Sequence, residues 1–98
     1  MPINQYILLI QDNAKSRATA AEWGQFLTAA KKSGMFYGGS EIGNREVLGD
    51  TDLARPTQPI TGYMRFDTDD KPKLLELLQS HPVVRHGGAV ELCELPKS

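Results

Sequence analysis

The stretch from Ile60 to Pro82 reads "ITGYMRFDTDDKPKLLELLQSHP" and changes from a strand pattern to a helix pattern within a few residues. In its first part, alternate residues are apolar, which is typical of a strand with one face on a core. The face expected inward carries Ile60, Gly62, Met64 and Phe66, and the opposite face carries Tyr63 and Arg65. This alternation predicts a strand over "ITGYMRFDT".

The second part of the stretch predicts a helix that ends near Ser80. Thr68 or Asp69 can cap its first turn, where Pro72 is tolerated. Pro82 biases the residue before it away from helical geometry, so the helix has to stop there. The face expected to be buried carries Leu74, Leu75, Leu77 and Leu78.

The residues that follow are expected to form a connection and a final strand. "VVRHGG" is interpreted as a turn, because the Gly-Gly pair precedes a strand pattern rather than the helix of a phosphate-binding loop. "AVELCEL" then alternates as a strand does, with Val90 and Leu92 on one face and Glu91 and Cys93 on the other.

The N-terminal half predicts a strand, a helix and a second strand. Residues 3–10, "INQYILLI", are apolar at both alternating sets of positions after Gln5, which is typical of a central strand. A helix over about Thr19 to Ser33 begins with a capping box between Thr19 and Glu22, and Gly34 suits its C-terminal cap. "MFYGGSEIG" is a short strand interrupted by two glycines, and residues 44–59 are a loop with room for a brief strand at Glu46 to Leu48.

The element order β-α-β-β-α-β predicts an α+β domain of the ferredoxin-like class over residues 1–98, with an antiparallel sheet and two helices on one face. The other face of such a sheet is uncovered. Its apolar residues predict an association surface, and a homodimer packed sheet to sheet is the simplest expectation.

Composition narrows the possible partners of the chain. It has 98 residues with a formal charge of −1, and its basic residues are scattered, so neither nucleic acid nor an anionic membrane is an expected partner. No apolar run could span a bilayer, and the N-terminus lacks a signal-peptide pattern. The one cysteine, Cys93, cannot form an internal disulfide, which indicates a cytoplasmic protein.

Four segments together resemble the YCII-related family, including its branch named for an Asp-Gly-Pro-Phe motif. They are "YILLIQDN", "AEWGQFLTAAKKSGMFYGGSEIG", "ITGYMRFDTDDKPKLLELLQSHP" and "GGAVELCELP". The resemblance implies a dimeric α+β barrel built from ferredoxin-like subunits. It covers most of the chain outside residues 44–59.

Two departures from the family pattern affect what the resemblance implies. The middle loop reads "GDTDLARPTQP" and lacks the Asp-Gly-Pro-Phe motif. Relatives carry a histidine in the first helix and an acidic residue before the proline that follows the second helix, a pair proposed to transfer protons. Here the first helix has no histidine, and the residue before Pro82 is His81, so that pair is absent.

The candidate catalytic residues are His81 and Asp12. An imidazole exchanges protons near neutral pH, and Asp12 could orient it. The structural alternatives are that His81 bonds a free carbonyl at the end of the second helix, and that Asp12 makes an Asx turn with the amides of "NAK". His86 could line the same site or lie on an exposed turn. Arg85 could clamp an anion or be solvated.

Other residues are expected to bind a ligand. Ser40 follows the glycine pair beside the expected cleft, and Trp23 and Tyr63 could stack on a planar molecule, although core packing also explains Trp23. No Cys or His spacing fits a metal site, and no cofactor is expected.

Two functions remain open at this point. One is a small-molecule enzyme of the YCII-related type that uses histidine for proton transfer. The other is a non-catalytic dimeric module that binds a ligand or a partner segment. A purely structural dimer is a third possibility.

Overall fold

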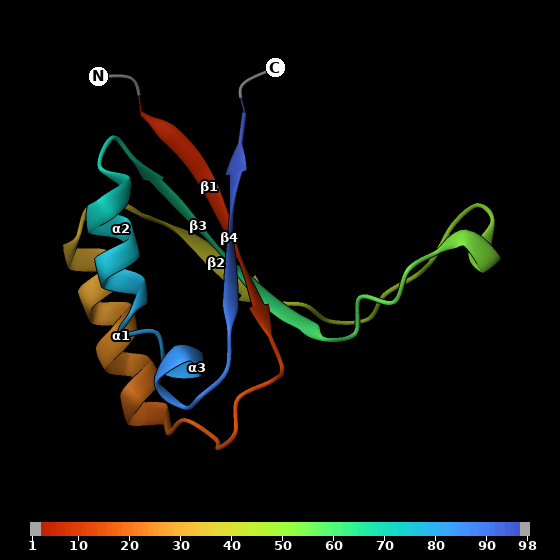
Figure 1. Cartoon of the computed structure of the whole chain (residues 1–98), viewed down its shortest axis with the longest axis horizontal. Coiled ribbons are helices and arrows are strands. Elements are labelled where there is room, and N and C mark those ends of the chain that lie inside the picture. Colours follow the sequence, from red (N-terminus) through yellow and green to blue (C-terminus); the bar gives the residue numbers. More distant parts are fainter. Residues whose placement is uncertain (1–2, 97–98) are drawn as a thin grey trace.

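The computed structural model describes residues 3–96 of the chain. The elements in chain order are β1 (Asn4–Gln11), α1 (Ala20–Lys32), β2 (Phe36–Glu41), the 3-10 turn η1 (Thr51–Leu53), β3 (Ile60–Thr68), α2 (Lys71–Leu78), α3 (Pro82–Arg85) and β4 (Val90–Leu95). Within this described part, four strands form one antiparallel sheet in the order β2-β3-β1-β4, and three α-helices accompany it. Figure 1 shows α1 and α2 together on one side of the sheet.

This arrangement is consistent with the ferredoxin-like α+β fold that the sequence predicts. β1 lies between β3 and β4, so the expectation that the first strand is central is confirmed. β3 has the bounds expected for it, and its burial alternates strictly, with Gly62, Met64, Phe66 and Thr68 on the buried face. Alternating burial follows from the two-residue repeat of a strand, because only one face meets the helices.

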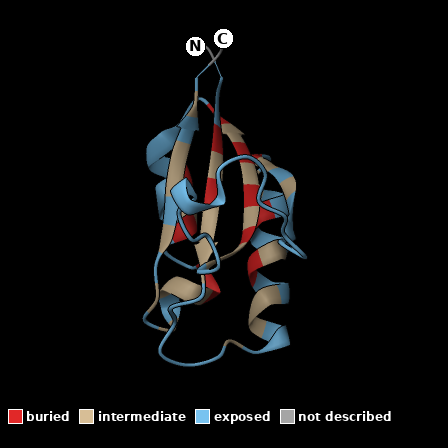
Figure 2. Ribbon diagram, turned by 90° about the vertical axis from the view of Figure 1, so that its right-hand side faces the viewer, coloured by how far each residue is buried: buried red, intermediate tan, exposed pale blue. Residues whose placement is uncertain are grey.

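The hydrophobic core lies between the sheet and α1 and α2. Leu8, Phe66 and Leu74 have no exposed surface, and Figure 2 shows that buried residues concentrate on the strands and on inward helix positions. Each such side chain contributes roughly 2–3 kcal/mol by leaving water. The full set of buried core residues is Tyr6, Leu8, Phe26, Ala30, Met35, Met64, Phe66, Leu74 and Leu78.

The signals that predict the ends of α1 are confirmed. The Thr19 hydroxyl accepts a hydrogen bond from the Glu22 N–H, and the Glu22 side chain accepts from the Thr19 N–H, both at 3.1 Å. At the other end, Lys31 and Lys32 occupy the last turn, and Gly34 follows with a φ of 76°. The capping box also fixes the position of the Glu22 carboxylate.

The glycine pair of β2 makes the expected irregularity. The register between β2 and β3 shifts between Phe36 and Gly39. A Cβ atom at Gly39 would collide with the Tyr63 carbonyl oxygen and would lie 2.9 Å from the Met64 Cα. The backbones therefore approach more closely here than any other residue type allows.

Several local expectations about α2 are wrong. Its N-cap is Asp70, whose carboxylate accepts from the Lys73 N–H at 3.1 Å, and not Thr68 or Asp69. The Thr68 hydroxyl instead accepts from the Asp70 N–H in the preceding turn. Leu75, expected to be buried, is 44% exposed, because a helix of two turns can place only one narrow stripe against the sheet.

The segment expected to be a plain connection contains the helix α3. Pro82 follows the end of α2 and is the first residue of a new helical turn. A proline is favourable at this position, because the backbone N–H that it lacks would have no partner there. His81 caps the N-terminus of α3 and His86 caps its C-terminus. The two histidines of the chain therefore stand at opposite ends of one helical turn.

Residues 42–59 form a long loop that projects away from the sheet in Figure 1. Every residue in it is exposed, and η1 is its only helical element within the described residues. No strand forms at Glu46 to Leu48, so that expectation is wrong. The guanidinium of Arg45 holds the base of the loop by donating to the carbonyl oxygens of Thr57 and Ile60.

Candidate functional site

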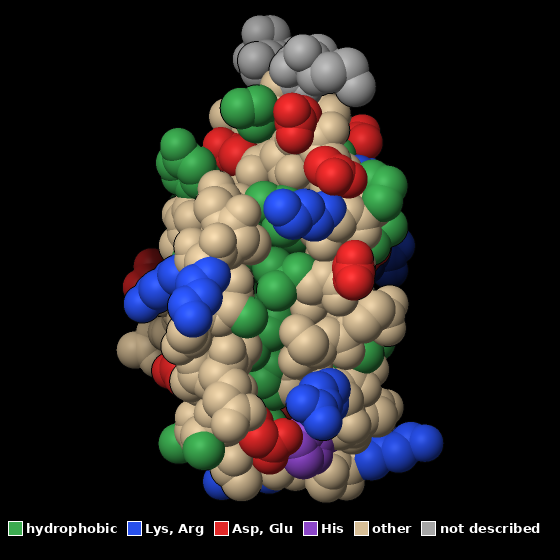
Figure 3. Space-filling model, turned by 90° about the vertical axis from the view of Figure 1, so that its left-hand side faces the viewer, with side chains coloured by type: hydrophobic (Ala, Val, Ile, Leu, Met, Phe, Trp, Pro, Cys, Tyr) green, Lys and Arg blue, Asp and Glu red, His purple; other side chains and the backbone are tan. Residues whose placement is uncertain are grey.

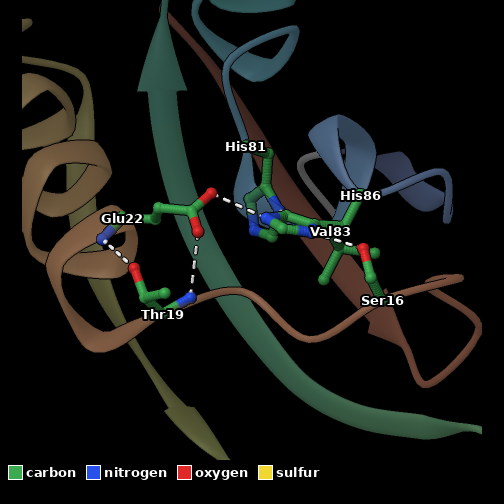
Figure 4. A network of polar contacts seen from close by, with 6 residues as sticks. All are labelled: Ser16, Thr19, Glu22, His81, Val83 and His86. Atoms are coloured by element: carbon green, nitrogen blue, oxygen red, sulfur yellow. Dashed lines mark hydrogen bonds and ion pairs between the residues drawn. The ribbon is translucent and has the colours of Figure 1, made fainter.

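Within residues 3–96, the only imidazole that contacts both a hydroxyl and a carboxylate is that of His86, at the C-terminus of α3. Its Nε2 lies 2.6 Å from Oε2 of Glu22, and its Nδ1 lies 2.7 Å from Oγ of Ser16 (Figure 4). We call these three residues the His86 cluster. It joins the loop after β1, the first turn of α1 and the end of α3.

A hydrogen bond within α1's capping box holds the Glu22 carboxylate in place independently of the histidine. Its Oε1 accepts the Thr19 N–H in the capping box, which leaves Oε2 for His86. The hydrogen bond from His86 and the bond from the Thr19 backbone lower the pKa of Glu22, so the group is ionised at neutral pH. An ionised carboxylate can only accept hydrogen bonds.

This acceptor decides the tautomer of His86. The Nε2 atom has to carry a hydrogen in order to donate to Glu22, so in the neutral ring Nδ1 has a free lone pair. The Ser16 hydroxyl then donates to Nδ1. The cluster thus places a hydroxyl proton against a basic nitrogen whose ring is oriented by an anion.

The loop that carries Ser16 is fixed on the turn that carries His86. The Lys15 N–H donates to the His86 carbonyl at 2.8 Å, and the Asn13 side chain accepts from the Ala89 N–H at 2.8 Å. A Cβ atom at Gly88 would lie 2.7 Å from Oδ1 of Asn13. The Gly-Gly pair, expected to serve only a turn, therefore also allows this close packing of two loops.

A hollow of about 420 Å³ lies beside Ser16. We call it the Ser16 hollow. Its charged lining residues are Asp12, Lys15 and Arg17, and Trp23 and Val83 contribute apolar surface. The side chain of His86 is 21% exposed and that of Glu22 is 33% exposed, so water and small solutes reach the cluster.

On the helix side, Figure 3 shows an apolar strip between the helices, with a histidine at one end beside acidic and basic side chains. A small groove of about 170 Å³ occurs here, and its lining includes Glu22, Phe26, Pro82 and Arg85. Glu22 thus borders this groove, while Ser16 borders the Ser16 hollow. The His86 ring lies between the Glu22 and Ser16 side chains and contacts both of them.

His81, expected to be catalytic, is completely buried. Its Nδ1 accepts from the Val83 N–H at 3.1 Å, so it caps the start of α3 and does not bond a free carbonyl of α2. Its ring makes edge contacts with Trp23 and Phe26, at centroid distances of 5.1 and 4.8 Å. Burial lowers the pKa of His81 to about 4, and its Nε2 has no hydrogen-bond partner within residues 3–96.

Asp12 does not meet His81. Its N–H donates to the Pro59 carbonyl at 2.7 Å, and among the described residues no hydrogen bond joins the Asp12 and His81 side chains. No hydrogen bond joins the Asp12 carboxylate to the "NAK" amides within residues 3–96, and the side chain of the neighbouring Asn13 accepts from the distant Ala89 N–H. Arg85 is exposed at the end of α3.

The remaining expected binding residues border a second cavity, of about 640 Å³, which we call the Trp23 cleft. Trp23, Ser40 and Tyr63 all line it, together with the apolar side chains of Leu27 and Phe36. The Ser40 hydroxyl donates to the Glu41 carbonyl. Trp23 also lines the Ser16 hollow, so one indole borders both cavities.

Two members of the His86 cluster were not expected from the sequence. The sequence assigns Glu22 only to the capping box and does not single out Ser16. The usable signal lay in the topology: the order β-α-β-β-α-β places β4 beside β1, so the loop after β1 has to meet the turn before β4. That juxtaposition brings together residues 70 positions apart.

No group of three or more His, Cys, Asp or Glu side chains between residues 3 and 96 converges as metal ligands would. Over the same residues, no helix combines the length and apolar character needed to cross a membrane. Comparison of the sequence with models of known protein families and with curated proteins gives no match. The function therefore has to be inferred from the geometry of the His86 cluster.

Proposed function

We propose that this protein is a small-molecule enzyme that uses His86 for proton transfer. The observation that carries the proposal is that both ring nitrogens of His86 are engaged, one by the Glu22 carboxylate and the other by a hydroxyl that faces a hollow. The role first expected of His81 passes to His86, because His81 is buried and Asp12 does not contact it.

The chemistry of the cluster suits a general base. Nδ1 of the neutral ring accepts a proton, and the Glu22 carboxylate stabilises the imidazolium that forms. A positioned base of this kind accelerates a reaction by about 10²–10⁴-fold. The small hollow with cationic and apolar walls suits a small carbonyl-bearing molecule.

We also propose that the chain is a YCII-related protein that acts in the cytoplasm. The segments that resemble this family form the four strands, α1 and α2. In this chain, His86 would perform the proton transfer that is proposed for the histidine and acidic pair of the relatives. The cytoplasmic assignment is supported by the single free thiol of Cys93, since a reducing compartment keeps such groups reduced.

The uncovered sheet face supports the further proposal of a homodimer. Ile7 pairs with Cys93 of β4, and Leu9 pairs with Tyr63 of β3, so these half-buried side chains share the face opposite the helices. Light scattering at micromolar concentration should give a dimer mass for the protein. Leu9→Arg should give a monomer, whereas the same change at the exposed Leu75 should leave the dimer intact. A monomer mass for the unaltered protein contradicts the proposal.

Turnover of a panel of small carbonyl compounds and esters tests the enzymatic proposal. His86→Gln should reduce kcat/KM by about 10²-fold or more, because the base is lost while the fold is kept. Glu22→Gln should reduce it by about 10-fold through loss of the orienting anion. Lys31→Gln, at the far end of the same helix, should have no effect. An unchanged rate in His86→Gln shows that His86 is not the base.

The second candidate is a non-catalytic binding module, and the volume of the Trp23 cleft favours it. Trp23 is the only tryptophan, so its fluorescence reports occupancy of the cleft directly. Saturable quenching by an apolar aromatic probe, with no turnover of any compound in the panel, supports this candidate. Absence of any fluorescence response to such probes contradicts it.

A further inference from the structure

We propose that Ser16 is a nucleophile that forms an acyl-enzyme, so that the reaction is acyl transfer to water. This inference rests on the proposed role of His86 as the base and adds the reacting atom. It needs Ser16 to be accessible, aligned with a base and held in place. Each of these conditions can be examined in the structure.

Ser16 is exposed and lines the Ser16 hollow, so an acyl group can approach its hydroxyl. Its Oγ lies 2.7 Å from Nδ1 of His86, which is the distance expected for a nucleophile and its base. Glu22 orients the other side of the ring at 2.6 Å. Nucleophile, base and acid therefore stand in line, with Nδ1 rather than the more usual Nε2 as the basic atom.

The loop that carries Ser16 is held on both sides of the residue. Asn13 and Lys15 bond the turn from His86 to Ala89, and Thr19 caps the start of α1 with a complete capping box. The hydroxyl is thereby fixed before any substrate binds, which lowers the entropic cost of reaching the reactive geometry.

The chemical step is balanced within the residues present and water. Oγ of Ser16 attacks the carbonyl carbon of an ester as its proton passes to Nδ1 of His86. The leaving alcohol takes that proton when the carbon-oxygen bond breaks, which leaves an acyl ester on Ser16. Water, deprotonated by Nδ1, then attacks the carbonyl carbon of this ester. As the bond from that carbon to Oγ breaks, the proton on Nδ1 passes to Oγ, which releases the acid and restores the serine hydroxyl.

Charge in the hollow indicates the substrate class. Lys15 and Arg17 flank Ser16 in the sequence, and both line the hollow with Asp12 as the only acidic group among its lining residues. The local excess of positive charge favours an acyl group that itself carries a carboxylate. The inferred substrate is thus the ester of a small dicarboxylic acid.

The test uses two esters of matched length, mono-p-nitrophenyl adipate and p-nitrophenyl hexanoate. Intact-mass measurement during turnover should show the protein plus one adipoyl group, and peptide mapping should place that group on Ser16. Ser16→Ala should abolish the adduct. Ser80→Ala should leave it unchanged, because the exposed Ser80 hydroxyl donates to the Leu77 carbonyl and, within residues 3–96, forms no hydrogen bond with a histidine nitrogen. Arg17→Ala should remove a preference of about fivefold for the charged ester.

A second variant tests the same geometry without relying on turnover. In Ser16→Cys, the thiol should be alkylated by iodoacetamide at about pH 6.5 at least tenfold faster than in Ser16→Cys with His86→Gln, because an adjacent histidine promotes the thiolate. Cys93 is present in both proteins and serves as the internal reference. Equal alkylation rates overturn the alignment of residue 16 with His86.

The two proposals fail in distinguishable ways. If His86→Gln abolishes turnover while Ser16→Ala retains it and no adduct forms, His86 is a base and Ser16 is not a nucleophile. If an adduct forms on another residue, the inference about Ser16 is wrong. If neither ester is turned over and the alkylation rates are equal, both proposals are contradicted.

Discussion

At the scale of single residues, the two histidines at the ends of α3 have opposite environments. His81 packs between Trp23 and Phe26 and must stay neutral there, because no partner among the described residues compensates for a buried charge. His86 is half-exposed beside a carboxylate that compensates for a charge. One turn of helix therefore carries an imidazole used for packing and capping and another suited to proton transfer.

The buried His81 makes stability depend on pH. Burial lowers its pKa to about 4, below that of about 6.5 in an unfolded chain, so the unfolded state takes up the proton first. The stabilisation is complete above about pH 6.5 and is lost as the pH falls toward 4. Between about pH 7 and pH 5 we expect the free energy of unfolding, from urea titrations, to fall by about 2 kcal/mol.

His81→Asn provides the control for this prediction. Asparagine keeps an N-cap acceptor for Val83 but does not titrate, and the Glu22 and His86 pair is unchanged. The variant should be less stable than the unaltered protein at pH 7, because it leaves a cavity beside Trp23. Its further loss between pH 7 and pH 5 should be much smaller. An equal loss in both proteins would place the titration elsewhere.

At the scale of elements, the structure depends on where backbones approach and where helices begin. The turn before β4 lies directly on the loop after β1 because Gly88 has no side chain. The position of Ser16 relative to His86 follows from this contact. Some glycines of the chain are thus required by close packing, whereas others only cost conformational entropy.

Gly88→Ala should destabilise the protein by about 1–3 kcal/mol, as overpacking does, because the added Cβ would lie 2.8 Å from backbone atoms of Ala14. Urea unfolding measures the loss, and the NMR signals of the His86 ring should shift as the loop moves. Gly43→Ala is the matched control, since its Cβ would meet nothing within 4 Å. Its effect should stay within about 0.5 kcal/mol. Equal effects would show that the close packing is unimportant.

Gly24→Ala should have the opposite effect and stabilise the protein by about 0.5–1 kcal/mol. Gly24 lies in the interior of α1, where alanine is the better helix former, and its Cβ would meet no atom within 4 Å. Thermal unfolding should show a higher Tm. Gly34→Ala, at a φ of 76° beyond the end of the same helix, should lower the Tm instead. A higher Tm in both variants would contradict the helical explanation.

Sequence patterns predict elements well where a local signal decides the outcome. β3 shows strict alternation, and α1 carries a capping box and a terminal glycine, so both were placed correctly. α3 was missed because Pro82 was taken only as a stop, although proline also starts helices. The Ser16 and Glu22 contacts to His86 were missed for a different reason. They depend on the pairing of β1 with β4, and no repeating pattern in the sequence encodes them.

At the scale of the whole molecule, the compact α+β body and the loop of residues 42–59 contrast sharply. The body buries the core between the sheet and two helices, whereas this loop projects from it and is exposed throughout (Figure 1). It includes exposed apolar side chains, of which Leu48 at 87% and Leu53 at 75% are the most open. The stability of the body should therefore be independent of most of the loop.

Replacing residues 47–55 with two glycines should change the free energy of unfolding by no more than about 1 kcal/mol. No buried side chain is removed, and the shorter connection has a slightly smaller closure entropy. Chemical denaturation measures the stability, and light scattering of the same sample measures the mass. If the homodimer forms through the sheet face, the mass should stay that of a dimer. A monomer mass would place the contact between subunits in the loop.

The pairing of β1 with β4 also determines when the His86 cluster can form during folding. Its two side-chain contacts close separations of 70 and 64 residues, and β4 is the last of the four described strands along the chain. Contacts of such high sequence separation carry the largest loop-closure cost and form late. The ring signals of His86, followed by NMR after rapid dilution from urea, should thus gain their native shifts only as the last phase of refolding ends. These signals therefore report when the sheet is complete.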